Sequence, residues 1–171
     1  DTYDGSPDAD VFMAEHEALA DRIAPEELID FRIGVGTVLG MSDELFERTI
    51  AAAGENGWAV HTHLAEVREE VTESTLLHGA STIQHAERSG LLDHEVIAGH
   101  CIWCSETDIG LLASKDVAVA HNPVANMILA SGVCPVPRLL REGVRIGIGT
   151  DGAASNDSQD MFGAIKTAAL L

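Results

Sequence analysis

Histidine, carboxylate and amide side chains gather at four short places in the sequence, and each place directly follows an apolar run. These places are 61–66 (His-Thr-His-Leu-Ala-Glu), 99–101 (Gly-His-Cys), 121–123 (His-Asn-Pro) and 149–152 (Gly-Thr-Asp-Gly). Imidazole and carboxylate together are a donor set that suits Zn²⁺ or Fe²⁺. Three histidines and one aspartate at four successive places therefore predict a metal site.

The apolar runs before these clusters are predicted to be strands, with helices between them. The runs lie at 58–64, 96–102, 117–121 and 144–148, after an apolar stretch at 29–38 that two glycines interrupt. Helical patterns lie at 11–23, 43–53, 81–89, 106–114, 137–142 and 160–171, and 66–73 is expected to be a polar loop or short helix. This alternation indicates an α/β protein whose parallel sheet is buried on both faces. The carboxyl ends of parallel strands share one edge, where active sites form.

Length, charge and cysteine content exclude several classes of protein. The chain has 171 residues, which length alone assigns to a single domain, and its formal net charge is −18. This charge argues against a nucleic-acid partner, because phosphate binding needs a basic patch. No apolar run reaches the roughly 18 residues of a membrane helix, and no secretion signal is visible. Three cysteines do not make a disulfide framework, so a cytoplasmic location is expected.

Five short sequence motifs occur along residues 57–171 in a characteristic order. They are His-Thr-His-Leu-Ala-Glu (61–66), Ala-Gly-His-Cys (98–101), Ala-His-Asn-Pro-Val-Ala-Asn-Met (120–127), Ala-Ser-Gly (130–132) and Gly-Thr-Asp-Gly-Ala-Ala-Ser-Asn (149–156). In these motifs the chain resembles the amidohydrolase superfamily, in particular its metal-dependent deaminases and triazine chlorohydrolases. The resemblance implies a (β/α)8 TIM barrel, of which residues 1–171 cover roughly the C-terminal half, from about strand 4 to the helix after strand 8. It also implies that the strand-1 His-x-His and a small flanking β-domain lie outside the chain.

The resemblance implies chemical roles for four residues. His63 and Asp151 would be ligands of one divalent metal ion, Zn²⁺ in preference to Fe²⁺. Asp151 would also accept the proton of the attacking water, and Glu66 would pass a proton to a ring nitrogen of the substrate. His100 would hydrogen-bond or ligate near that water. A metal that lowers the pKa of water, together with two carboxyl groups that move protons, is a coherent hydrolytic set.

The resemblance also bears on the substrate, which is expected to be a small N-heterocycle that loses ammonia. The motifs most resemble those of deaminases of S-adenosylhomocysteine and methylthioadenosine. However, residues 34–40 lack the substrate-binding histidine of those enzymes, and residues 125–129 lack their Ser and Lys. The ring system therefore stays open among purine, guanine-type and triazine substrates. The residues expected to contact substrate are Asn122, Asn126 and Ser155.

Several alternatives accompany this interpretation. A triazine chlorohydrolase is one, and a non-catalytic amidohydrolase-like binding protein is another; a homo-oligomer is open in each case. Gly-Ile-Gly-Thr-Asp-Gly at 147–152 satisfies a dinucleotide-binding pattern, but its aspartate would repel a pyrophosphate. Cys-Ile-Trp-Cys at 101–104 has no second cysteine pair, which favours buried or loop cysteines over a zinc ribbon. His61 is expected one layer below His63 in the barrel interior.

Overall fold

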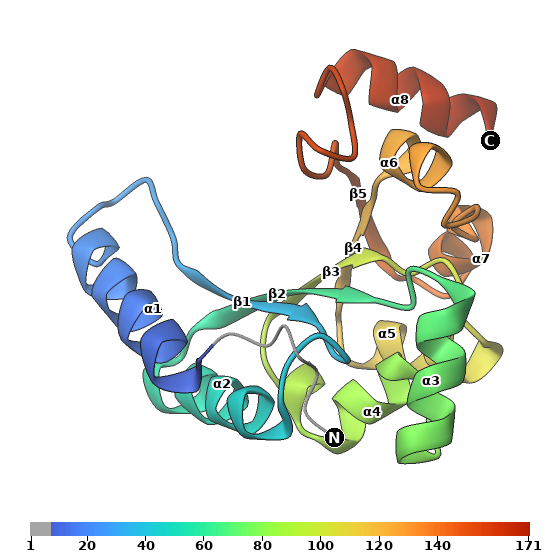
Figure 1. Ribbon diagram of the computed structural model, residues 1–171. Coiled ribbons are helices and arrows are strands. Elements are labelled where there is room, and N and C mark those ends of the chain that lie inside the picture. Colours follow the sequence, from blue (N-terminus) through green and yellow to red (C-terminus); the bar gives the residue numbers. More distant parts are fainter. Residues whose placement is uncertain (1–7) are drawn as a thin grey trace.

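Five parallel strands, each followed by helical structure, make up the fold of this computed structural model, which describes residues 8–171 (Figure 1). The strands pair in chain order, so each neighbours the strand before and after it. They are β1 (Arg32–Thr37), β2 (Ala59–Leu64), β3 (Val96–His100), β4 (Ala118–His121) and β5 (Arg145–Ile148). Consecutive parallel strands joined by helical crossovers are the βα arrangement that the sequence predicts.

The helices lie where the predicted patterns place them, with two differences. They are α1 (Ala9–Ile23), α2 (Asp43–Asn56), α3 (Arg68–His78), α4 (Thr82–Arg88), α5 (Glu106–Ser114), α6 (Pro123–Ile128), α7 (Val136–Arg141) and α8 (Met161–Leu170), with a short 3-10 turn η1 (Leu91–Asp93). Helix α3 runs well past the loop or short helix expected at 66–73, and α6 was not predicted.

Both differences have a physical reason. Helix α3 exposes Leu76 and Leu77 and buries Glu70 and Ser74, so its sequence shows no apolar stripe. Helix α6 has six residues, too few for a periodic pattern, and its one signal is a proline in the first turn. Neither helix has a side-chain hydrogen bond at its N-cap.

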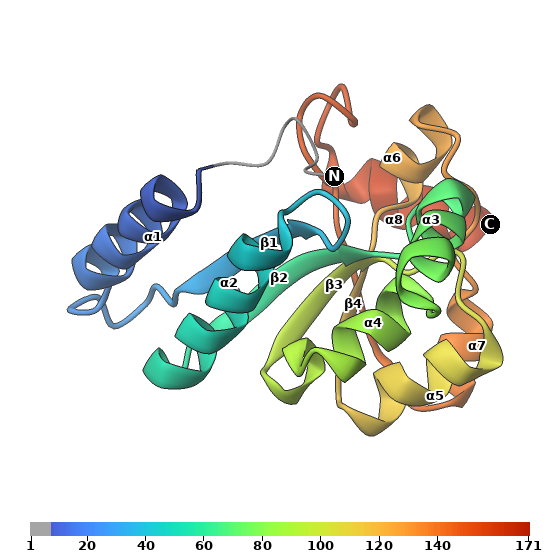
Figure 2. The same ribbon diagram turned by 60° about the horizontal axis from the view of Figure 1, so that its bottom comes forward.

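The core lies between one face of the sheet and the helices that pack on it. In β2, Val60, Thr62 and Leu64 are buried, while His61 is exposed and His63 is half-buried on the other face. Helices α2, α4 and α5 lie along the same side of the curved sheet (Figures 1 and 2). Their most buried side chains are Leu45, Ile83, Ile109 and Leu112. Burial of these side chains against the strands is the main stabilising contribution of this layer.

The other face of the sheet, which carries His61 and His63, is less buried than the sequence predicts. Arg145 and Gly147 of β5 are exposed, and so is His61, which was expected within the barrel interior. Five strands form an arc, and the described helices pack mainly on its outer side, so inward side chains meet few partners. Among residues 8–171, no helix is both long enough and apolar enough to cross a bilayer.

Asp108 ties the beginning of α4 to the beginning of α5. Its buried carboxylate accepts hydrogen bonds from the Ser81 hydroxyl, from Gln84 Nε2 at 3.0 Å and from the backbone N–H of Ser105 at 2.8 Å. The Ser105 hydroxyl in turn caps the Asp108 N–H, which completes a capping box. This carboxylate therefore satisfies donors at two helix N-termini at once.

We expect Asp108→Ala to lower the free energy of unfolding by about 2–3 kcal/mol, because hydrogen bonds to a charged group contribute about 1.5–3 kcal/mol. Urea denaturation of the complete protein measures this change. Asp10→Ala is the control: its carboxylate binds Arg48 at 2.9 Å but its side chain is 90% exposed, so we expect a change of about 0.5 kcal/mol. Equal effects of the two substitutions would contradict the assignment.

Candidate active site

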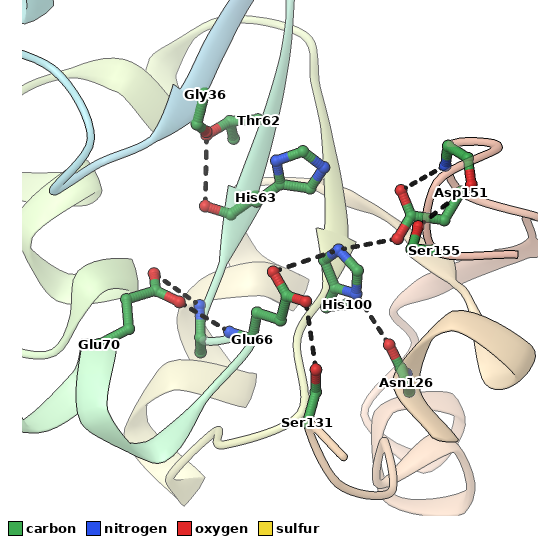
Figure 3. A network of polar contacts seen from close by, with 12 residues as sticks. Gly36, Thr62, His63, Glu66, Glu70, His100, Asn126, Ser131, Asp151 and Ser155 are labelled. Atoms are coloured by element: carbon green, nitrogen blue, oxygen red, sulfur yellow. Dashed lines mark hydrogen bonds and ion pairs between the residues drawn. The ribbon is translucent and has the colours of Figure 1, made fainter. Parts of the chain in front are cut away.

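Three potential metal ligands converge at the carboxyl edge of the sheet. His63 comes from β2, His100 ends β3 and Asp151 follows β5 (Figure 3). One ligand atom from each lies within 4.8 Å of the others, and these three are the one such group found among the described residues. His121, the third strand-end histidine, is buried but does not join the group, and its Nδ1 has no partner within residues 8–171. The structure thus brings together two of the three histidines with the aspartate.

Glycine at position 99 makes room for the His63 ring. The parallel register pairs His63 with Gly99 and Leu64 with His100. A Cβ added to Gly99 would lie 2.7 Å from His63 Cδ2, closer than side chains pack. The His63 imidazole therefore lies directly against the backbone of β3, and any larger residue at position 99 would displace it.

Two of the three side chains stand on left-handed backbone. The φ angles of His100 and Asp151 are +68° and +63°, and Cys101 follows at +47°. Aspartate tolerates this region better than most residues, whereas histidine and cysteine adopt it less readily. Conformations of this kind persist where surrounding contacts hold them, and they cluster at functional sites.

The loop after β2 aims Glu66 into the same cluster. Glu66 Oε2 lies 3.6 Å from His100 Nε2, and Asp151 Oδ2 lies 3.8 Å from the same nitrogen (Figure 3). Buried Glu70 holds the loop, because its carboxylate accepts the N–H of Ala65 at 3.3 Å and of Glu66 at 2.9 Å. Burial raises the pKa of Glu70, and these backbone hydrogen bonds oppose that rise. Sequence reasoning missed Glu70, which reads as an ordinary acidic residue of a helix first turn.

Asp151 lies in a turn whose carbonyls are held by two amide side chains. Asn156 Nδ2 donates to the carbonyl of Thr150 at 2.8 Å, and Gln159 Nε2 donates to that of Asp151 at 3.1 Å. The Asp151 carboxylate also accepts the N–H of Gly152 at 2.7 Å. Ser155, expected to contact substrate, binds locally through its hydroxyl to the carbonyl of Gly152. Its substrate role stays a prediction.

The two other expected substrate contacts, Asn122 and Asn126, are both buried. Asn126 is 2% exposed, and its Oδ1 lies 2.8 Å from His100 Nδ1. Its Nδ2 has no hydrogen-bond partner within residues 8–171, which costs about 1–3 kcal/mol for a buried amide. Asn122 packs so closely on Gly149 that a Cβ there would lie 2.3 Å from Asn122 Oδ1. The substrate roles of both residues stay predictions.

The electrostatic surroundings favour neutral imidazole at His63. Burial, and to a smaller extent neighbouring His100, lower its pKa, while Glu66 and Asp151 oppose the shift. A neutral imidazole is the form that ligates a metal ion. His63, His100 and Asp151 thus form a nitrogen–oxygen donor set of the type that zinc takes in hydrolytic sites.

The three cysteines take no part in this site. All are free, with Cys101 and Cys134 buried, and burial raises the pKa of Cys134 to about 12. Buried thiols with raised pKa values are chemically inert. The described residues hold no metal-ligand group built on cysteine. The expectation of buried or loop cysteines thus agrees with the structure.

Comparison with known proteins identifies the family to which this fold and this candidate site belong. Residues 5–171 match the amidohydrolase family, and the chain belongs to this family. It is 42% identical over 146 residues to a 5'-deoxyadenosine deaminase of Methanothermobacter thermautotrophicus, covering 85% of this chain and 34% of the relative. It is 48% identical over 125 residues to a 5-methylthioadenosine/S-adenosylhomocysteine deaminase of Desulforudis audaxviator, covering 73% of this chain and 29% of the relative.

Solved structures give the same result for the fold. An adenosine deaminase from Xanthomonas campestris with bound zinc superposes with a TM-score of 0.89 and 36% identity, over 94% of this chain and 37% of that one. Atrazine chlorohydrolase from Arthrobacter aurescens complexed with zinc superposes with a TM-score of 0.83 and 27% identity, over 95% of this chain and 36% of that one. The predicted fold class, part of an amidohydrolase (β/α)8 barrel, is confirmed. The chain spans about a third of the length of the curated relatives it matches.

We expect Gly99→Ala to weaken zinc binding by the complete protein about ten- to a hundredfold, the range seen when the support of a metal ligand is disturbed. The added Cβ displaces the His63 ring. Competition titration with a chromophoric chelator measures the affinity. Gly110→Ala in α5 is the matched control, because a Cβ there meets nothing within 4 Å. Unchanged zinc affinity in Gly99→Ala would refute the close fit of His63 on β3.

Proposed function

We propose that the complete protein is a metal-dependent hydrolase that removes the exocyclic amino group of a small N-heterocycle and releases ammonia. One observation carries this proposal: His63, His100 and Asp151 converge within 4.8 Å, with Glu66 lying 3.6 Å from His100 Nε2. Two carboxylates beside a candidate metal site are what hydrolytic displacement with proton transfer needs.

His63 and Asp151 are the proposed ligands of one divalent ion. The donor set fits zinc, and the absence of a side chain at Gly99 leaves the space that the His63 ring fills. Zinc is named with two of the similar structures, which supports Zn²⁺ over Fe²⁺. The remaining protein ligands are proposed to be a His-x-His pair at another strand end, outside residues 1–171. Residues 1–171 would then be the part of the catalytic barrel from about strand 4 onward, with a small β-domain beyond it.

The residues of this chain divide the proton transfers between them. A bound Zn²⁺ would lower the pKa of water toward neutrality. Asp151 accepts the proton that the water loses as its oxygen attacks the ring carbon. Glu66 donates a proton to the adjacent ring nitrogen. Asp151 then passes the water proton to the amino group, which leaves as ammonia, and Glu66 assists by taking back the proton of the new hydroxyl group as the ring carbonyl forms. His100 Nε2 lies between the two carboxylates, 3.6 Å from Glu66 Oε2 and 3.8 Å from Asp151 Oδ2, and is proposed to hydrogen-bond or ligate near the attacking water.

An adenosine derivative is the proposed substrate class. The relatives named as deaminases of 5'-deoxyadenosine and of methylthioadenosine are 42% and 48% identical, against 27% for the atrazine chlorohydrolase. Asn122 and Ser155 are proposed to contact the substrate. The missing histidine at 34–40 and the missing Ser and Lys at 125–129 keep guanine-type and triazine substrates as alternatives. A cytoplasmic location is proposed from composition alone.

We expect Glu66→Gln in the complete protein to lower kcat at least about a hundredfold, because the amide cannot deliver the proton. Its zinc content should not change. Asp151→Asn should abolish turnover and weaken zinc binding together. Steady-state ammonia release and metal analysis measure both effects. Glu69→Gln, an exposed glutamate in the first turn of α3, is the control and should behave as wild type. Wild-type rates in either site variant would remove the assigned roles.

A substrate screen tests the function itself. The zinc-loaded complete protein is assayed for ammonia release from 5'-substituted adenosines, guanine, pyrimidines and aminotriazines, and for chloride release from chlorotriazines. We expect the highest kcat/KM with a 5'-substituted adenosine. Chloride release would establish the triazine alternative. Tight binding of a heterocycle without any product would favour the non-catalytic alternative.

A further inference from the structure

We propose that Asn126 and Ser131 are positioning residues that hold two side chains of the candidate site, His100 and Glu66, in one fixed arrangement. They lie at the two ends of a single turn, residues 126–131, which we call the clamp. One end binds His100 and the other binds Glu66 (Figure 3). The expected effect on turnover rests on the proposed function, whereas the hydrogen bonds that orient His100 and Glu66 do not depend on it.

The Asn126 end fixes the tautomer of His100. Asn126 Oδ1 lies 2.8 Å from His100 Nδ1, and both side chains are at most 2% exposed. A carbonyl oxygen accepts hydrogen bonds and cannot donate, so the Nδ1 of His100 carries the proton. Its Nε2 therefore presents a lone pair toward Glu66 and Asp151. The partner of one ring nitrogen decides the role of the other.

The Ser131 end fixes which oxygen of Glu66 can carry a proton. The Ser131 hydroxyl donates to Glu66 Oε1 at 3.2 Å, and Ser131 is 3% exposed. Oε1 is thereby occupied as an acceptor. The other oxygen, Oε2, faces His100 Nε2 at 3.6 Å. The proton that Glu66 delivers is therefore placed on Oε2, on the side of the candidate metal site.

The turn between the two ends is built as a helix-terminating Schellman motif. The N–H of Ser131 donates to the carbonyl of Asn126 at 2.9 Å, and the N–H of Ala130 donates to that of Met127 at 3.3 Å. Ala130 occupies the left-handed position, with φ +55°, where glycine is usual. Trp103 Nε1 also donates to the carbonyl of Ser131 at 2.8 Å. Backbone, side chains and a neighbouring indole thus lock both ends of the clamp.

These contacts close a ring. Glu66 contacts His100, His100 binds Asn126, the backbone of Asn126 binds Ser131, and Ser131 binds Glu66. A shift at one end of the turn therefore moves the other, which couples His100 to Glu66. In this proposal Asn126 acts through His100 and Ser131 acts through Glu66, so their contribution is orientation.

The kinetic test uses Ser131→Ala in the complete, zinc-loaded protein. We expect kcat to fall about ten- to a hundredfold, as for other groups that orient active-site side chains, while KM, zinc content and melting temperature stay near wild type. Ser114→Ala is the matched control, because this exposed serine binds only the carbonyl of Leu111. A kcat within about twofold of wild type overturns the proposal, and so does a loss of kcat that parallels loss of zinc or of folded protein.

A second measurement is independent of turnover. Nitrogen-15 NMR of the histidine rings reports the tautomer of His100, which we expect to carry its proton on Nδ1 in the wild type and in Asn126→Asp, where an acceptor oxygen remains. Asn126→Leu, which has no acceptor, should lose this preference. An Nε2-protonated wild type, or an unchanged tautomer in Asn126→Leu, overturns the clamp. If the wild type releases no product from any substrate, the proposed function fails while this measurement still decides the clamp.

Discussion

Parallel pairing of β2 with β3 determines the separation of the chemical groups in this site. The register that places Gly99 beside His63 also places His100 beside Leu64, one step further along. His63 therefore reaches the edge of the sheet across a residue without a side chain, and His100 leaves β3 as the strand ends. A slip of β3 by one residue would turn its side chains to the opposite face and put side-chain atoms where the His63 ring lies. Every contact of Glu66 and Asp151 with His100 depends on this pairing.

The site stores backbone strain and offsets it with hydrogen bonds from outside the cluster. His100, Asp151 and Ala130 all adopt left-handed backbone, which costs of order 1–3 kcal/mol for each residue. The compensating contacts come from amide and carboxylate side chains in the following segments, such as Asn156 on the Asp151 turn and Glu70 on Ala65, which is also left-handed. Local instability is thus matched by tertiary contacts, which makes the geometry of the candidate ligands rigid before any ion binds.

The sequence predicts the strands well because each is an apolar run that ends in polar residues. The same pattern predicts which side chains approach one another, since parallel strands end at a common edge. It does not predict the contacts that orient them. Ser131 lies 65 positions from Glu66 and Asn126 lies 26 positions from His100, so no local spacing indicates either pair.

Two further elements show the same limit. Helix α6 is too short for periodicity, and α3 buries a glutamate where an amphipathic helix buries leucine. Glu70 is buried because the loop before it presents two backbone N–H groups that need an acceptor. Its role follows from the path of the backbone and not from the residues around it in the chain.

The candidate site gathers electron-rich nitrogen and oxygen atoms, and this argues against a purely structural role for its side chains. With its Nδ1 proton bound to Asn126, His100 directs a lone pair toward carboxylate oxygens at 3.6 Å and 3.8 Å. Imidazole nitrogen and two carboxylates at such distances repel one another unless a positive charge or a shared proton lies among them. A protein that used this edge only for packing would be more stable with apolar or amide side chains at these positions. Two carboxylates and two imidazoles, each held by separate hydrogen bonds or close packing, therefore support the proposed site for a divalent cation and for proton transfer.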